Sequence, residues 1–265
     1  MCRWVAYHGA PVFLEDFITL PCQSLIAQSH HAREAKTEVN ADGFGIGWYG
    51  ERPRPGVFRD IRPAWSDDNL LSIAHQIRSR LFLAHVRAST GTATTRANCH
   101  PFTVGEWMFM HNGQIGGYHR LRRKLELAIP EALYEHRTGT TDSEALFLMM
   151  LGAGLGDDPM QAMAMTLGAI EAEMAAAGVT EPLKITAAFT DGRALHAVRY
   201  STDAAPPTLY TRACCPDGGT LVVSEPLDDV RDGWSAVPPQ SFVTVTATGV
   251  EVRDFRPVRG LARAA

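Results

Sequence analysis

The second residue of this chain is a cysteine whose place near the terminus allows a specific kind of nucleophilic catalysis. Removal of Met1 would give Cys2 a free α-amine, whose ordinary pKa of about 7.7 to 8.0 lets it act as a general base near neutral pH. The nucleophile and its base would then lie on one residue, and no Ser-His-Asp relay is needed elsewhere in the chain. The start of the sequence therefore predicts acyl-transfer chemistry at Cys2.

A second segment suited to this chemistry is His111-Asn112-Gly113-Gln114, which directly follows an apolar run predicted to be a strand. An acyl-transfer site needs hydrogen-bond donors that face the developing oxyanion. The Asn112 side-chain amide and the Gly113 backbone N–H are suitable donors at the end of a strand. The alternative is that Asn112-Gly113 forms an ordinary turn.

Two charged residues, Arg87 and Asp142, have both a functional and a structural interpretation. Arg87 follows the strand predicted at residues 81–86, and an arginine at a strand end is normally a solvated charge. Asp142 lies in Thr141-Asp142-Ser143-Glu144, where it could equally be the N-cap of the helix that follows. Residue type alone leaves both alternatives open.

The composition is that of an ordinary soluble protein, with 45% apolar residues, 20% charged residues and a net charge of -4 over 265 residues. We expect residues 1–258 to form one domain and residues 259–265 to be a loose C-terminal tail. The net charge predicts neither a nucleic acid nor a membrane partner. The longest apolar stretch, at residues 145–156, is too short to span a bilayer, and the start lacks a secretory signal. These features predict a cytoplasmic protein.

The five cysteines have no CxxC spacing, which argues against both a disulfide framework and a zinc ribbon. We therefore expect neither a metal nor another cofactor.

Strands are predicted in two sets that are separated along the chain by helices. The first set is 3–7, 44–49, 81–86 and 106–110, and the second is 184–189, 195–200, 208–211, 220–224, 241–246 and 250–254. Asp191-Gly192 and Thr248-Gly249 resemble hairpin turns, so neighbouring strands should be antiparallel. Helices are expected from an N-cap at Ser66 to residue 80, and at 117–135 with a break at Pro130, 142–151 and 159–177. This order indicates an α+β fold with antiparallel sheets covered by helices.

Six segments together resemble class II glutamine amidotransferases in their order and approximate spacing. They are Met1-Cys2-Arg3, Asp42-Gly43-Phe44-Gly45-Ile46-Gly47-Trp48, His85-Val86-Arg87-Ala88-Ser89-Thr90-Gly91, Asn98-Cys99-His100-Pro101-Phe102, His111-Asn112-Gly113 and Thr141-Asp142-Ser143-Glu144. A later segment, Ser224-Glu225-Pro226-Leu227, resembles one found in the small stand-alone members that begin Met-Cys-Arg. The ergothioneine-pathway γ-glutamyl hydrolases are similar proteins of this type.

The resemblance implies a four-layer αββα sandwich, which is the N-terminal-nucleophile hydrolase fold, and a role for each matching residue. Cys2 would attack the γ-amide carbon of glutamine or a γ-glutamyl conjugate and form a γ-glutamyl thioester. Asn112 and Gly113 would form the oxyanion hole. Arg87 would bind the substrate α-carboxylate, for which its planar fork is suited, and Asp142 would bind the α-ammonium group.

Four further residues are implied to shape the loop over the substrate site, namely Arg3, Thr90, Gly91 and His100, whereas Asp42 is expected to make structural hydrogen bonds. The products would be glutamate and either ammonia, for transfer to a separate synthase subunit, or an amine. The small-molecule substrate is therefore glutamine or a γ-glutamyl amide. The alternative function is a non-catalytic glutamine-binding or regulatory subunit.

Overall fold

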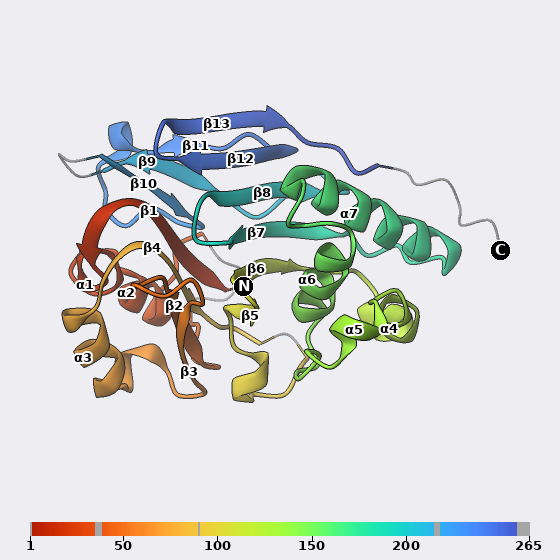
Figure 1. Ribbon diagram of the computed structural model, residues 1–265, viewed down its shortest axis with the longest axis horizontal. Coiled ribbons are helices and arrows are strands. Elements are labelled where there is room, and N and C mark those ends of the chain that lie inside the picture. The colour runs from red at the N-terminus through yellow and green to blue at the C-terminus, as the bar shows by residue number, and fades with distance from the viewer. Residues whose placement is uncertain (1, 35–38, 90, 215–217, 259–265) are drawn as a thin grey trace.

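The computed structural model describes residues 2–34, 39–89, 91–214 and 218–258, and the architecture given below is that of these residues (Figure 1). The predicted tail at residues 259–265 and the site residue Thr90 lie outside the described residues. The assignment of residues 1–258 to one domain stays a prediction.

The first sheet has seven strands in the order β11-β9-β10-β1-β4-β2-β3, and its paired strands are antiparallel. Strand β1 directly follows Cys2 and lies between β10 and β4, near the middle of the sheet. The strands are β1 Arg3–Phe13, β2 Phe44–Trp48, β3 Gly56–Asp60, β4 Arg78–Val86, β9 Tyr210–Ala213, β10 Gly219–Val223 and β11 Ser235–Ala236.

The second sheet has six strands, also antiparallel, in the order β13-β12-β8-β7-β6-β5. The two predicted hairpins, β7–β8 and β12–β13, are confirmed within it. Its strands are β5 Phe102–Val104, β6 Trp107–Gln114, β7 Lys184–Thr190, β8 Leu195–Ser201, β12 Ser241–Thr246 and β13 Gly249–Asp254.

Helices form two outer layers, one over each sheet (Figure 1). The first sheet is covered by α1 Glu15–Ile18, α2 Leu25–His30 and α3 Asp68–Gln76, and the second by α4 Tyr118–Leu127, α5 Glu131–Tyr134, α6 Asp142–Gly152 and α7 Pro159–Ala176. Short 3-10 turns lie at Ala64–Ser66, Arg96–Asn98 and Arg231–Gly233. Among the described helices, none combines the length and apolar character that crossing a membrane requires.

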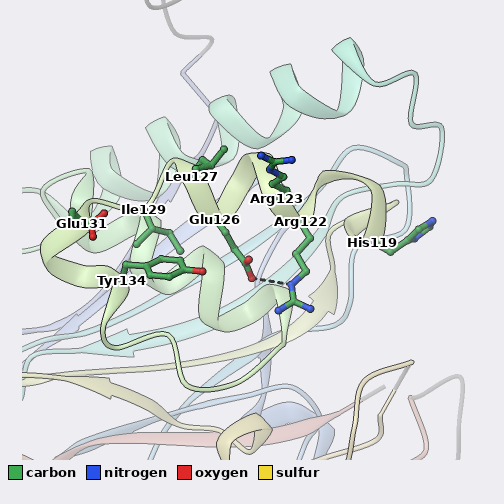
Figure 2. Close-up of a pocket in the computed structure, with 8 residues that line it drawn as sticks. All are labelled: His119, Arg122, Arg123, Glu126, Leu127, Ile129, Glu131 and Tyr134. Atoms are coloured by element: carbon green, nitrogen blue, oxygen red, sulfur yellow. Dashed lines mark hydrogen bonds and ion pairs between the residues drawn. The ribbon is translucent and has the colours of Figure 1, made fainter.

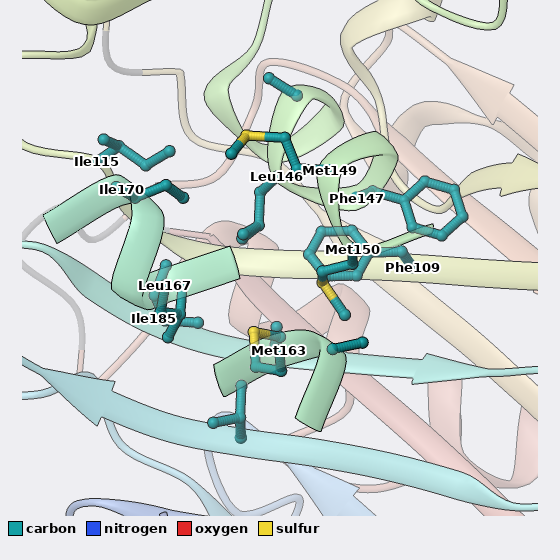
Figure 3. Packing of buried hydrophobic residues seen from close by; sticks show 14 of the residues in the cluster. Phe109, Ile115, Leu146, Phe147, Met149, Met150, Met163, Leu167, Ile170 and Ile185 are labelled. Carbon is teal, nitrogen blue, oxygen red and sulfur yellow. The ribbon is translucent and has the colours of Figure 1, made fainter. Parts of the chain in front are cut away.

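Three apolar cores separate the four layers, and strand alternation assigns side chains to them. In β1, Trp4 and Ala6 belong to the core between the sheets, whereas Val5 and Tyr7 pack beneath α1 to α3. In β6, Phe109 faces the other helical layer and stacks on Phe147 of α6 with ring centroids 5.3 Å apart (Figure 3). Two sheets packed face to face between helices confirm the predicted αββα sandwich.

The boundaries of the first long helix were predicted wrongly. Ser66 lies in a 3-10 turn, and the side chain of Asp67 caps α3 by accepting a 2.8 Å hydrogen bond from Leu70 N. The helix ends at Gln76 because Arg78 already pairs with Phe13 across β1 and β4. Residues 78–80 therefore form the start of β4, although their side-chain pattern also suits a helix.

The last predicted helix and the break at Pro130 are confirmed. Asp158 caps α7 by accepting from Gln161 N, and Pro159 occupies the first turn, where its missing N–H costs nothing. Pro130 separates α4 from α5 and precedes the first residue of α5. Proline and capping residues therefore predicted these helix boundaries correctly.

Candidate active site

One cavity of about 250 Å³ brings together Cys2, Arg87, Asn112, Gly113 and Asp142, which the sequence had placed in four separate segments. It is also lined by His100 and by Ala88, Ser89, Thr92, His111, Gln114, Thr141, Ser143 and Lys184. The lining comes from Cys2 just before β1, the residues that follow β4, the second half of β6, the start of α6 and the first residue of β7. The two sheets therefore both contribute to the cavity.

Strand register places Cys2 and Arg87 at the same end of the first sheet. Arg3 is opposite Val86 in the antiparallel β1–β4 ladder, so Cys2 and Arg87 lie one residue beyond the end of this ladder. The Cys2 thiol lies 3.6 Å from the carbonyl oxygen of Ala88. Burial raises the pKa of this thiol, and the positive charge of Arg87 opposes the effect. A thiol with a raised pKa needs a base before it can attack a substrate.

Asn112 presents an unpaired hydrogen-bond donor in this cavity. Its side chain is only 1% exposed, and its Nδ2 has no hydrogen-bond partner among the described residues. A buried amide donor without a partner costs about 1–3 kcal/mol, and most buried polar groups in proteins have a partner. An oxyanion formed in the cavity would provide the missing acceptor.

Asn112 and Gly113 are part of strand β6, so the alternative that they form a turn is wrong. They are opposite Thr186 and Ile185 in the β6–β7 ladder. A Cβ atom on Gly113 would lie 1.9 Å from the carbonyl oxygen of Lys184, so the close approach of β7 requires glycine at this position. Glycine at position 113 is therefore explained by the close contact between β6 and β7 rather than by a turn.

The guanidinium of Arg87 is held in place by the protein. It is 3% exposed, and it donates to the Asp42 carbonyl oxygen at 3.2 Å and to the Thr92 hydroxyl at 2.7 Å. The interpretation of Arg87 as a solvated charge is therefore wrong. Asp42 also accepts a 2.7 Å hydrogen bond from Ser89 N, which is the structural role expected for it.

Thr141, and not Asp142, is the N-cap of helix α6, because its hydroxyl accepts a 3.2 Å hydrogen bond from Glu144 N. Asp142 is the first residue of the helix, and its Oδ1 accepts from Ser143 N at 2.8 Å. Its Oδ2 accepts from Ile115 N at 2.9 Å. The half-buried carboxylate is thus oriented by two backbone donors while it lines the cavity.

His100 lies in the cavity wall as a neutral ring. It is 4% exposed, neither ring nitrogen has a hydrogen-bond partner within the described residues, and its ring centroid is 4.2 Å from that of His85. Burial lowers the pKa of His100 well below its usual range and that of His85 to about 3. Gly45 permits this packing, since a Cβ atom there would lie 2.1 Å from the His100 carbonyl oxygen.

Gly91 lies outside this lining. It is exposed, and a Cβ atom built on it would contact nothing within 4 Å. Conversely, Lys184 lines the cavity, although no sequence pattern predicted it as a site residue. Its ammonium group lies 2.8 Å from the Asp203 carboxylate. Ser143 also lines the cavity, and its place in the Thr141-Asp142-Ser143-Glu144 segment was a signal for this position.

No group of three His, Cys, Asp or Glu residues in the described chain is arranged as a metal site.

A larger hollow of about 630 Å³ lies elsewhere, over helices α4 and α5, and it contains none of the predicted site residues. Its wall includes Arg122 and Glu126, which form an ion pair at 2.9 Å (Figure 2). Of the residues that the structure describes, no cysteine, serine or threonine lines this hollow, so volume alone does not identify the reactive site.

Comparison with protein families matches residues 15–212 to the model described as glutamine amidotransferases class-II. The match begins after Cys2, so it is independent of the proposed nucleophile.

Two similar curated proteins cover nearly the whole chain. The probable glutamine amidotransferase DUG3 of Saccharomyces cerevisiae is 32% identical over 92% of this chain and 82% of its own length. The γ-glutamyl-hercynylcysteine sulfoxide hydrolase of Mycolicibacterium smegmatis is 32% identical over 95% of this chain and 99% of its own.

Solved structures agree with this result. A glutamine aminotransferase class-II domain protein from Silicibacter pomeroyi has a TM-score of 0.78 and 41% identity, and the match covers 97% of this chain and 100% of that one. The glutamine phosphoribosylpyrophosphate amidotransferase of B. subtilis has a TM-score of 0.65 at 15% identity, covering 96% of this chain and 49% of that one, which shows a common fold alone.

Proposed function

The chain belongs to the class II glutamine amidotransferases, and we propose that it hydrolyses γ-glutamyl amides with Cys2 as the nucleophile. The observation that carries this proposal is the unpaired amide of Asn112 in the same cavity as the Cys2 thiol. A hydrolase needs both groups, whereas a protein that only binds glutamine needs neither.

In the proposed reaction, removal of Met1 exposes the α-amine of Cys2, which takes the proton from the thiol. The sulfur then attacks the γ-amide carbon, and the resulting oxyanion accepts hydrogen bonds from Asn112 Nδ2 and Gly113 N–H. The leaving amine takes the proton from the α-ammonium group, which leaves a γ-glutamyl thioester. Water, deprotonated by the same α-amine, attacks the thioester, and glutamate and the free thiol are formed.

The glutamate end of the substrate would be bound by opposite charges on two rigid supports. Arg87 offers its planar guanidinium to the α-carboxylate, and Asp142 offers its oriented carboxylate to the α-ammonium group. His100 shapes the wall, and Thr90 and Gly91 belong to the loop proposed to lie over the substrate. These assignments require only the glutamyl part of the substrate, so they fit both glutamine and larger γ-glutamyl amides.

We favour an amine leaving group over ammonia. A relative that is 32% identical over 95% of this chain is named γ-glutamyl-hercynylcysteine sulfoxide hydrolase, and that name describes a γ-glutamyl conjugate rather than glutamine as the substrate. In the second version, the enzyme releases ammonia to a separate synthase subunit. A cytoplasmic location is part of both versions.

The direct test is glutamate release by protein shown by mass spectrometry to begin at Cys2. L-Glutamine and a panel of γ-glutamyl amides should be compared, with Cys2→Ala as the inactive control and a thermal melt to show that it is folded. A conjugate with a kcat/KM well above that of glutamine would support the amine version. Turnover by folded Cys2→Ala would exclude Cys2 as nucleophile, and glutamine binding without turnover would support the regulatory alternative.

A further inference from the structure

The conspicuous feature outside the cavity is a buried ion pair immediately after the nucleophile. Arg3 is fully buried, and its Nε lies 2.9 Å from Oε2 of Glu225, which is 3% exposed. Burying two charges carries a large desolvation cost, so such a pair is weak evidence for stability by itself. Glu225 belongs to the Ser224-Glu225-Pro226-Leu227 segment, to which the proposed reaction assigns no role.

Arg3 connects this pair directly to Cys2. Its Nη1 donates to the Cys2 carbonyl oxygen at 3.2 Å. Cys2 lies outside strand β1, which begins at Arg3, so it lacks the regular ladder that holds the rest of the strand. The thiol and the α-amine are both attached to the Cys2 α-carbon. Fixing the adjacent carbonyl group therefore restricts the orientation of nucleophile and base together.

The residue before Glu225 holds the next residue of β1. Trp4 N donates to the Ser224 hydroxyl at 2.9 Å, and Ser224 N donates to the Trp4 carbonyl oxygen at 3.1 Å. These contacts continue beyond the β1–β10 ladder, whose register ends at Val5 and Val223. Ser224 and Glu225 thus contact Trp4 and Arg3, respectively, at the start of β1.

Glu225 also reaches the segment that leads towards the substrate arginine. Its Oε1 accepts from Arg33 N at 2.9 Å and its Oε2 accepts from Glu34 N at 2.9 Å. Beyond residues 35–38, Asp42 N donates to the Arg87 carbonyl oxygen at 3.0 Å, and Arg87 Nη1 donates to the Asp42 carbonyl oxygen at 3.2 Å. One carboxylate therefore contacts both Arg3, next to the proposed nucleophile, and the backbone of Arg33 and Glu34.

We propose that Arg3 and Glu225 are positioning residues that orient the thiol and α-amine of Cys2 towards the cavity. The inference rests on the proposed role of Cys2 as nucleophile. The pair acts through the peptide group between Cys2 and Arg3, and it contacts neither the substrate nor the reacting atoms. A buried ion pair is weak evidence for stability, and an apolar side chain in place of Arg3 could not hold the Cys2 carbonyl group.

The test uses two variants that separate orientation from stability. Arg3→Lys keeps a cation beside Glu225 but removes the guanidinium that reaches the Cys2 carbonyl oxygen. Arg3→Met combined with Glu225→Gln removes both charges together, so no unpaired charge is left buried. Asp228→Asn is the matched control, because Asp228 lies three residues after Glu225 and pairs with Arg212 rather than with Arg3.

Each variant should be shown by mass spectrometry to begin at Cys2 and by thermal melting to be folded. We expect kcat to fall about 10- to 100-fold in both Arg3 variants, with KM within about twofold of wild type, because small displacements of reacting groups have effects of this size. Alkylation of Cys2 by an electrophilic glutamine analogue should slow in parallel. Asp228→Asn should retain wild-type kcat.

Wild-type kcat in a folded Arg3→Lys protein or in the folded double variant would overturn the positioning role. A lower kcat in Asp228→Asn of the same size would also overturn it, since the effect would then belong to the segment in general. Absence of labelling at Cys2 in the wild-type protein would instead refute the proposed nucleophile, so the two failures are distinguishable.

Discussion

Asp142 accepts a 2.9 Å hydrogen bond from Ile115 N, and this contact joins the start of helix α6 to the residue that follows strand β6. Asn112 lies on that strand, so the proposed oxyanion donor and the proposed ammonium ligand share one rigid unit. A side chain at a helix start usually serves the helix, but Thr141 already provides the cap. Asp142 is therefore available for the substrate.

Replacing Asp142 with Asn should remove the charge while retaining an acceptor for Ile115 N. We expect kcat/KM for glutamine to fall about 10- to 100-fold, since a hydrogen bond to a charged group contributes about 1.5–3 kcal/mol. The melting temperature should change little. Asp158→Asn makes the same chemical change at the start of α7 and should leave kcat/KM unaltered. Equal kinetics for the two variants would contradict the ammonium-binding role.

Arg87→Lys tests whether the substrate carboxylate needs two hydrogen bonds from a planar guanidinium or only a positive charge. The guanidinium already donates to Asp42 and Thr92, and a lysine cannot keep that geometry while it binds a carboxylate. We expect kcat/KM to fall at least about 10-fold, as measured by glutamate release at substrate concentrations well below KM. Unchanged kcat/KM would leave Arg87 with a structural role only.

Asn112→Ala should lower kcat by about 100- to 1,000-fold, the loss seen when one oxyanion donor is removed. Protein stability should not fall through the loss of a hydrogen bond, because the Nδ2 group that is removed has no partner among the described residues. An electrophilic glutamine analogue should still label Cys2, though more slowly, because alkylation needs no oxyanion. A variant that melts early but turns over at the wild-type rate would return Asn112 to a structural role.

The buried His85 should make the protein less stable as the pH falls. Its folded-state pKa is about 3, below the ordinary value of about 6.5, so the unfolded chain binds more protons between these values. The free energy of unfolding should therefore fall by up to about 1.4 kcal/mol per pH unit for this residue as pH decreases from 6.5.

His85→Leu should flatten this dependence, as measured by urea unfolding at a series of pH values. The neighbouring His100 and His111 are also buried with lowered pKa values, so part of the slope should remain. Replacement of His119, an exposed histidine on α4, is the control. An identical pH slope in His85→Leu and wild-type protein would show that His85 charges as readily in the folded state as in the unfolded chain.

Local patterns predicted most of the strands and the cap of α7, and the resemblance to class II glutamine amidotransferases predicted the motif residues that meet in the cavity. They failed where a distant partner decides the local structure. Residues 77–80 suit a helix, but pairing with β1 makes most of them strand. Asn112 and Gly113 have the composition of a turn, but β7 pairs with them and leaves no room for a larger side chain at Gly113. The pairing of Arg3 with Glu225 could not be read from either segment alone, because it depends on how β1 and β10 lie in one sheet.

The contact between Trp4 and Ser224 joins residues 220 positions apart, which affects when during protein synthesis the site can be completed. At typical elongation rates of about 5–20 residues per second, Ser224 follows Trp4 by roughly 10 to 45 seconds. Strand β1 can pair with β4 earlier, but its other edge stays open until β10 has left the ribosome. A nascent or truncated chain without residues 219–225 lacks the Arg3–Glu225 pair, so under the proposed mechanism incomplete molecules should not hydrolyse γ-glutamyl amides. The apolar strand beside Cys2 is also a site at which nascent chains would benefit from a chaperone.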